Sequence, residues 1–188
     1  MPSTRQVVTA LYGAWRLLRF DTGGMAWFDV SLPGFWRSFF AAVLVAPGFA
    51  VLIALRLAAR SEPYDLGWTI VVSTVAYGVG WVAFPIVAVF ITRLLALTDR
   101  YFALIIALNW ASVPQMLVFV PVVLIDAGGL LPMPLGPVAT IAATLFVIAY
   151  QWFVIRTALA TDALTASGVV VLQLVIDGFV EFGADSLI

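Results

Sequence analysis

Residues 67–125 contain two long apolar runs that are separated by one short polar turn, Thr98-Asp99-Arg100. A bilayer core of about 30 Å requires about 20 apolar residues in an α-helix, which rises about 1.5 Å per residue. Both runs meet this requirement, so the stretch is predicted to form a hairpin that crosses a membrane twice. With 64% hydrophobic and 10% charged residues among 188, the whole chain is too apolar for a soluble domain.

The same length criterion predicts one transmembrane domain at residues 35–182, preceded by a segment at 1–34 and followed by a short tail at 183–188. The expected spans are 35–57, 67–97, 101–125, 138–156 and 163–182. The predicted fold is therefore all-α, a polytopic membrane helical bundle of about five transmembrane helices.

Two of the spans depart from a simple apolar helix. The second is longer than an upright helix needs, so we expect it to tilt or to bend near Pro85. The fifth is interrupted by Gln173, Asp177 and Glu181, and acidic residues at membrane depth are costly. A spanning helix is preferred at 163–182, and a re-entrant or surface helix is the alternative.

The N-terminal segment has the pattern of an amphipathic helix. Ser3 and Gln6 have the spacing of a capping box, in which each side chain bonds the other's backbone N–H. Apolar residues then recur on one face at helical spacing: Val7, Leu11, Ala14, Trp15 and Leu18. The helix is expected either to lie in the membrane interface or to pack on the protein's own spans.

The distribution of Arg predicts the orientation. The nine basic residues are all Arg. With five spans and a cytoplasmic N-terminus, Arg56 and Arg60 lie outside, and the others lie inside: Arg5, Arg16, Arg19, Arg37, Arg93, Arg100 and Arg156. Because positive residues are enriched in cytoplasmic loops, the C-terminus is predicted to face outward.

In this topology, a pair of basic residues and a pair of acidic residues are both expected near the outer membrane surface. Arg56 and Arg60 are four residues apart, as are Asp177 and Glu181, so each pair shares one helix face. The four groups are hypothesised to form an ion-pair cluster that docks the last helix against the first. The alternative is that each side chain separately extends to water.

Four uncharged amide side chains lie at membrane depth: Asn109, Gln115, Gln151 and Gln173. Each must find a hydrogen-bond partner, which in a bundle is usually another helix. Their preferred interpretation is interhelical hydrogen bonding. The alternative is a hydrated cavity near Pro85 and Pro114, where a proline leaves a backbone carbonyl free.

The turn between the second and third spans carries Arg93, Asp99 and Arg100. Such a short charged connector is typical of a solvated hairpin turn, and a cytoplasmic docking surface is the alternative. The chain contains no His and no Cys, so no catalytic, cofactor or metal site is predicted. There is also no basic patch of the size that nucleic-acid binding needs. We therefore expect a protein that is not an enzyme.

Two stretches resemble segments of bacterial Yip1-domain membrane proteins. They are WFDVSLPGFWRSF at 27–39, which is similar to the segment before the first span, and FITRLLALTDRYFALIIALNWASVP at 90–114, which is similar to the middle hairpin. The resemblance implies a bundle in the bacterial inner membrane and no catalytic residue. The expected function is that of an interaction or scaffolding protein, or of an accessory subunit of a membrane complex. The expected partners are the lipid bilayer and a membrane-protein partner or a second copy of the chain. The alternative is a small channel or transporter with a polar cavity near spans two and three.

Overall fold

The computed structural model describes residues 1–61 and 63–188, and this part of the chain contains helices and no strand. The elements are α1 (Thr4–Leu18), η1 (Thr22–Trp27), α2 (Leu32–Ser38), α3 (Phe40–Ala58), α4 (Leu66–Leu94), η2 (Thr98–Arg100), α5 (Tyr101–Ala127), α6 (Leu135–Leu159) and α7 (Ala163–Asp185). Five segments are long and apolar enough to cross a membrane: Leu32–Ala58, Leu66–Leu94, Thr98–Ala127, Leu135–Leu159 and Ala163–Asp185. The predicted all-α membrane bundle is confirmed.

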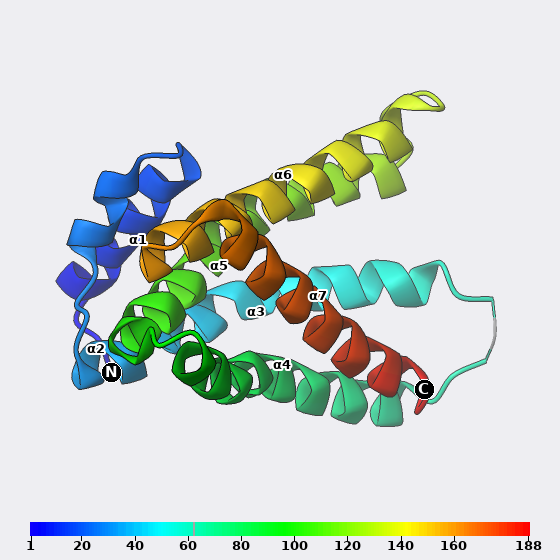
Figure 1. Ribbon diagram of the computed structural model, residues 1–188. Coiled ribbons are helices and arrows are strands. Elements are labelled where there is room, and N and C mark those ends of the chain that lie inside the picture. Colours follow the sequence, from blue (N-terminus) through cyan, green and yellow to red (C-terminus); the bar gives the residue numbers. More distant parts are fainter. Residues whose placement is uncertain (62) are drawn as a thin grey trace.

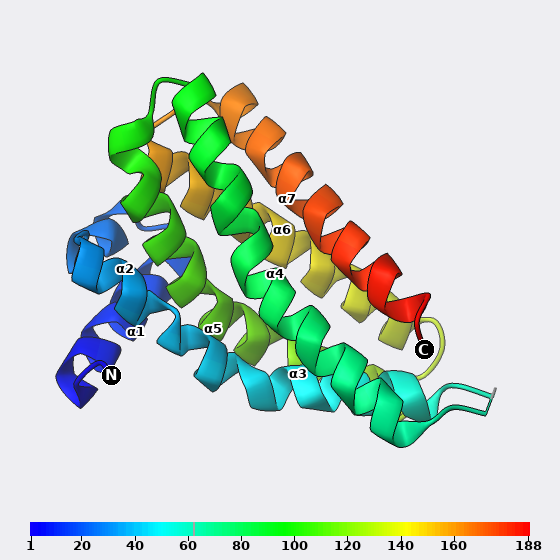
Figure 2. The same cartoon turned by 90° about the horizontal axis from the view of Figure 1, so that it is seen from below.

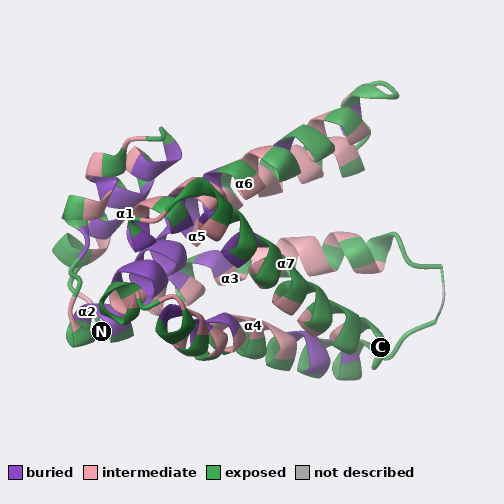
Figure 3. Cartoon of the chain, in the orientation of Figure 1, coloured by how far each residue is buried: buried purple, intermediate pink, exposed green. Residues whose placement is uncertain are grey.

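The bundle has two different ends (Figures 1 and 2). At one end, here called the α1 end, lie α1, α2, the η2 turn and the turn between α6 and α7. At the other, the C-terminal end, α3 and α5 finish, α4 and α6 begin, and the chain terminates. The helices pack closely at the α1 end and diverge toward the C-terminal end. Buried residues accordingly gather at the α1 end (Figure 3).

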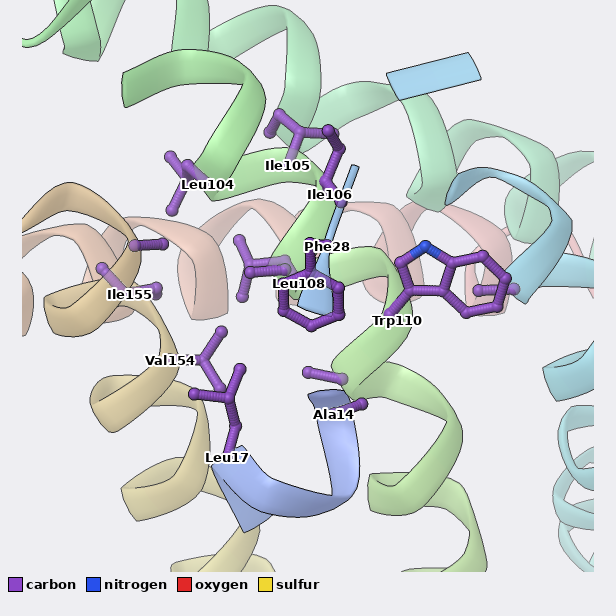
Figure 4. Packing of buried hydrophobic residues seen from close by; sticks show 14 of the residues in the cluster. Ala14, Leu17, Phe28, Leu104, Ile105, Ile106, Leu108, Trp110, Val154 and Ile155 are labelled. Carbon is purple, nitrogen blue, oxygen red and sulfur yellow. The ribbon is translucent and has the colours of Figure 1, made fainter. Parts of the chain in front are cut away.

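The first half of α5 is the centre of the packed core. Its buried residues run from Ala103 to Pro114, whereas the second half of the helix contributes none among those described. Leu104 and Leu108 face Val154 of α6 and Leu17 of α1 in one apolar cluster (Figure 4). This packing closes the α1 end of the bundle.

Helix α1 docks on this core through its apolar face. The predicted capping box is present, with Ser3 N–H donating to Gln6 Oε1 at 2.9 Å and Gln6 N–H donating to Ser3 Oγ at 3.3 Å. Ala14 is fully buried, and its carbonyl accepts a hydrogen bond from the Tyr150 hydroxyl of α6 at 2.9 Å. Trp15 departs from the expected face and stays 53% exposed. Of the two expected placements of this helix, packing on the protein's own helices therefore applies to most of its apolar face.

The turn after α1 is held by Asp21. Its carboxylate accepts hydrogen bonds from Arg16 Nε at 2.6 Å and from the Gly23 N–H at 2.9 Å. Both bonds favour the charged form and hold the pKa of Asp21 below its ordinary value. The turn brings η1 back onto α1, so that Gly24 lies against Gly13 and Leu17.

The long helices differ in detail from the expected spans. Helix α4 ends at Leu94, before the expected residue 97, because Ala96 adopts the left-handed conformation with φ of 54° and turns the chain toward α5. Pro85 lies inside α4 without ending it, and its carbonyl accepts a hydrogen bond from the Tyr101 hydroxyl at 3.1 Å. Helix α7 is continuous and begins at the N-cap Asp162. A spanning helix rather than a re-entrant segment thus fits the fifth candidate.

Replacing Gly24 with Ala tests the contact between α1 and η1. The added Cβ would lie 2.5 Å from the Gly13 carbonyl oxygen and 3.0 Å from the Leu17 backbone nitrogen, and backbone cannot move aside cheaply. We expect the free energy of unfolding to fall by about 1–3 kcal/mol, as overpacked sites do. The matched control is Gly168→Ala on α7, where a Cβ meets nothing within 4 Å. Equal thermal unfolding of the two variants in detergent would show that the close approach is unimportant.

Candidate functional site

A cavity of about 1110 Å³ lies between the five long helices, each of which contributes residues to its lining. Going around it, α3 packs on α5, α5 on α6, α6 on α7 and α7 on α4. The ring is completed by Tyr77 of α4, whose hydroxyl donates to the Ala42 carbonyl of α3 at 2.6 Å. The Tyr77 ring also stacks on Phe49 of α3, with centroids 4.6 Å apart.

The cavity reaches the C-terminal end of the bundle and stops at the packed core. Its lining includes Arg60 and Ile188, which lie beyond the last residues of α3 and α7. Toward the α1 end it is bounded by Phe84, Ile105 and Leu108, which belong to the apolar core. The space is therefore closed on the side of α1.

All four amides predicted at membrane depth line this one cavity: Asn109, Gln115, Gln151 and Gln173. At a rise of about 1.5 Å per residue, Asn109 lies about 12 Å along α5 from Tyr101. Gln151 lies about 12 Å along α6 from its end at Leu159, and Gln173 about 15 Å along α7 from its start. Because a bilayer core is about 30 Å thick, these three amides lie near its middle.

The amides divide into two groups by their hydrogen bonds. Asn109 Nδ2 donates to Ser38 Oγ of α2 at 2.9 Å, which is the interhelical role that the sequence suggests. Gln115, Gln151 and Gln173 make no side-chain hydrogen bond to any residue that the structure describes, and Gln173 Oε1 is enclosed without a partner there. An unsatisfied buried polar atom costs about 1–3 kcal/mol. These three amides therefore do not serve to join helices.

The charged lining residues lie nearer the C-terminal end. Arg56 of α3 forms ion pairs with Glu181 and Asp185 of α7, the second at 3.0 Å between Nη1 and Oδ1. The hypothesised docking of the last helix on the first is thus made by Arg56 and Glu181, with Asp185 in the place expected for Asp177. The reason is spacing, because Asp185 continues the same face of α7 one turn further and lies at the level of Arg56.

The other two residues of the hypothesised cluster also line the cavity. Neither Arg60 nor Asp177 forms an ion pair with a charged residue within 1–61 and 63–188. Asp177 is exposed to the cavity, one helical turn before Glu181. The charge cluster at the C-terminal end therefore joins α3 to α7 through Arg56 alone and leaves the Asp177 carboxylate on the cavity wall.

The charges of the turn between α4 and α5 lie at the opposite end of the bundle. Arg100 Nε is 3.6 Å from Asp99 Oδ2, and both side chains are exposed. Arg93 is exposed in the last turn of α4, where a positive charge favours the helix C-terminus. These three residues do not contribute to the cavity.

One wall of the cavity is aromatic and was not predicted from the sequence; it is formed by Phe49, Tyr77, Trp81, Phe84 and Phe119. The Tyr77 and Trp81 ring centroids are 6.1 Å apart, so Phe49, Tyr77 and Trp81 form a continuous row from α3 to α4. The spacing of residues 77, 81 and 84 places them on one helix face. That spacing is visible in the sequence, but aromatic residues that face lipid have the same spacing, so it does not indicate a cavity.

Fold and cavity together define an all-helical, polytopic membrane protein with an internal cavity whose mostly apolar lining carries a few amide and charged side chains. In the described ranges, no three His, Cys, Asp or Glu side chains are grouped to hold a metal ion. No family model, curated protein or solved structure matches the chain. The resemblance to Yip1-domain proteins therefore stays a prediction.

Exchanging the charges of Arg56 and Glu181 tests the contact between α3 and α7. Arg56→Glu should lower thermal stability, because the new carboxylate faces Glu181 and Asp185. The double variant with Glu181→Arg should recover most of the loss. These side chains are about half exposed, so we expect a coupling of about 1 kcal/mol or less in a double-mutant cycle. Arg5→Glu, an exposed charge change on α1, is the control, and a double variant no more stable than Arg56→Glu would contradict the pairing.

Proposed function

We propose that the protein is a small-solute channel or transporter whose solute site is the cavity. The observation that supports this best is that Gln115, Gln151 and Gln173 face one cavity at membrane depth without a protein partner in the described chain. In hydrocarbon such groups are costly unless water or a polar ligand completes their hydrogen bonds. Solute sites of transporters commonly lie near the bilayer midplane.

The orientation that we propose makes the cavity outward-facing. Two of the nine Arg residues, Arg56 and Arg60, lie at the C-terminal end of the bundle, and the other seven lie on elements of the α1 end. By the positive-inside rule the α1 end is cytoplasmic and the C-terminus is outside. The membrane would be the bacterial inner membrane, following the resemblance in the sequence. Solute would then enter from outside and stop at the packed core.

A second candidate is an interaction or scaffolding protein, or an accessory subunit, of the Yip1-like kind. It is favoured by the exposed aromatics at the α1 end: Tyr12, Trp15, Trp27 and Trp36. Such amphipathic rings can lie in the membrane interface or contact a partner or a second copy. A stoichiometric partner in gentle-detergent purification would favour this candidate. Neither candidate is an enzyme.

Cysteine labelling tests whether the cavity contains water. The chain has no Cys, so an introduced thiol is unique. Gly80 lines the cavity near the middle of α4, and a Cβ there meets nothing within 4 Å. In Gly80→Cys, the thiol should react with a membrane-impermeant maleimide added outside intact cells, because the reactive thiolate forms in water.

Gly78→Cys is the matched control. Gly78 is two residues away on the same helix, has equally open space, and is exposed on the outer surface of the bundle. Its thiol would face lipid and should stay unlabelled. If Gly80→Cys is also unlabelled from either side of the membrane, the cavity is dry and the proposed function fails.

A further inference from the structure

We propose that the solute of the cavity is an organic cation, held between the Asp177 carboxylate and the aromatic row of Phe49, Tyr77 and Trp81. The inference rests on the proposed function and names its ligand class. A cavity of about 1110 Å³ can hold a whole small molecule, since ligand pockets commonly measure about 300–1,000 Å³.

The charges of the cavity favour a positive ligand. Three carboxylates and two guanidinium groups line it. Arg56 is already shared between Glu181 and Asp185, so its charge is more than matched. Arg60 lies beyond the end of α3, at the C-terminal end of the cavity. Asp177 is left as an exposed carboxylate on the wall, with no cation beside it in the described structure.

The register between α4 and α7 puts Asp177 level with the aromatic row. Trp68 Nε1 donates to the Leu187 carbonyl at 2.7 Å, which aligns the start of α4 with the end of the antiparallel α7 (Figure 2). Asp177 precedes Leu187 by about ten residues, so at equal rise it faces α4 near Gly78. Tyr77 lies at that level and stacks on Phe49, and Trp81 is one turn deeper.

A carboxylate opposite aromatic faces is the chemistry that recognises alkylammonium groups. The negative ring faces attract a cation within about 6 Å of the centroid, and the attraction strengthens when water is displaced. Hard inorganic cations instead require about six to eight oxygen ligands, which one carboxylate and scattered amides do not supply. An anion would find Arg56 already paired, and Arg60 lies at the C-terminal end of the cavity, beyond the end of α3 and away from the aromatic row. The amides would then bond the polar part of the ligand.

The test measures binding of radiolabelled choline to the purified, reconstituted full-length chain. The competitor 3,3-dimethylbutan-1-ol has the same shape without the charge, and acetate supplies an anion. We expect choline to bind at least about tenfold more tightly than the alcohol, as a charge-dependent site requires. Asp177→Asn should remove this preference and Asp177→Glu should retain it. Asp99→Asn makes the same charge change at the α1 end and should bind as the unaltered chain does.

The outcomes separate this inference from the proposed function. If the alcohol binds as tightly as choline, if Asp177→Asn leaves choline binding unchanged, or if choline does not bind, the cation assignment is wrong. Displacement by acetate alone would also overturn it. In each of these cases, labelling of Gly80→Cys from outside would still support a water-filled cavity. Absence of that labelling would instead refute the cavity as a solute site.

Discussion

Water is missing from the bilayer core, so every polar group in it must find a partner inside the protein. Between the helices this constraint is met by tyrosine hydroxyls, together with the amide of Asn109, which bonds Ser38. Tyr150 donates to a carbonyl of α1, Tyr77 to a carbonyl of α3 and Tyr101 to a carbonyl of α4. Each ring also fills space between helices. Interhelical hydrogen bonds of this kind contribute about 1 kcal/mol or less each, but they select which faces meet.

The cavity is lined by the amides that take no part in these interhelical hydrogen bonds. Because tyrosine hydroxyls and Asn109 make the interhelical contacts, Gln115, Gln151 and Gln173 are free to face the space where the helices diverge. At the C-terminal end, Arg56 bridges α3 and α7. Its side chain is half exposed, as expected for a charged group in contact with water. A packed half at the α1 end, and a cavity with amide and charged side chains that reaches the C-terminal end, are the features expected of a solute site closed on one side.

Local features could be predicted from the sequence, whereas the inward faces of the long helices could not. The five apolar segments and the Ser3–Gln6 box depend on neighbouring residues alone. Helices α3 to α7 are apolar around most of their circumference, because lipid and core are equally apolar. No periodicity therefore shows that Gln151 faces a cavity, or that Asp185 rather than Asp177 pairs with Arg56. The amphipathic α1 is the exception, and its buried face was largely predictable.

The most direct measurement is a cryo-electron microscopy structure of the chain in a lipid nanodisc, at a resolution that shows ordered water. A water-filled solute site predicts water density beside Gln115 and Gln151, continuous with the C-terminal end of the bundle, with the α1 end closed. Lipid acyl-chain density in that space, or helices α3, α4 and α7 packed together without a cavity, would contradict it.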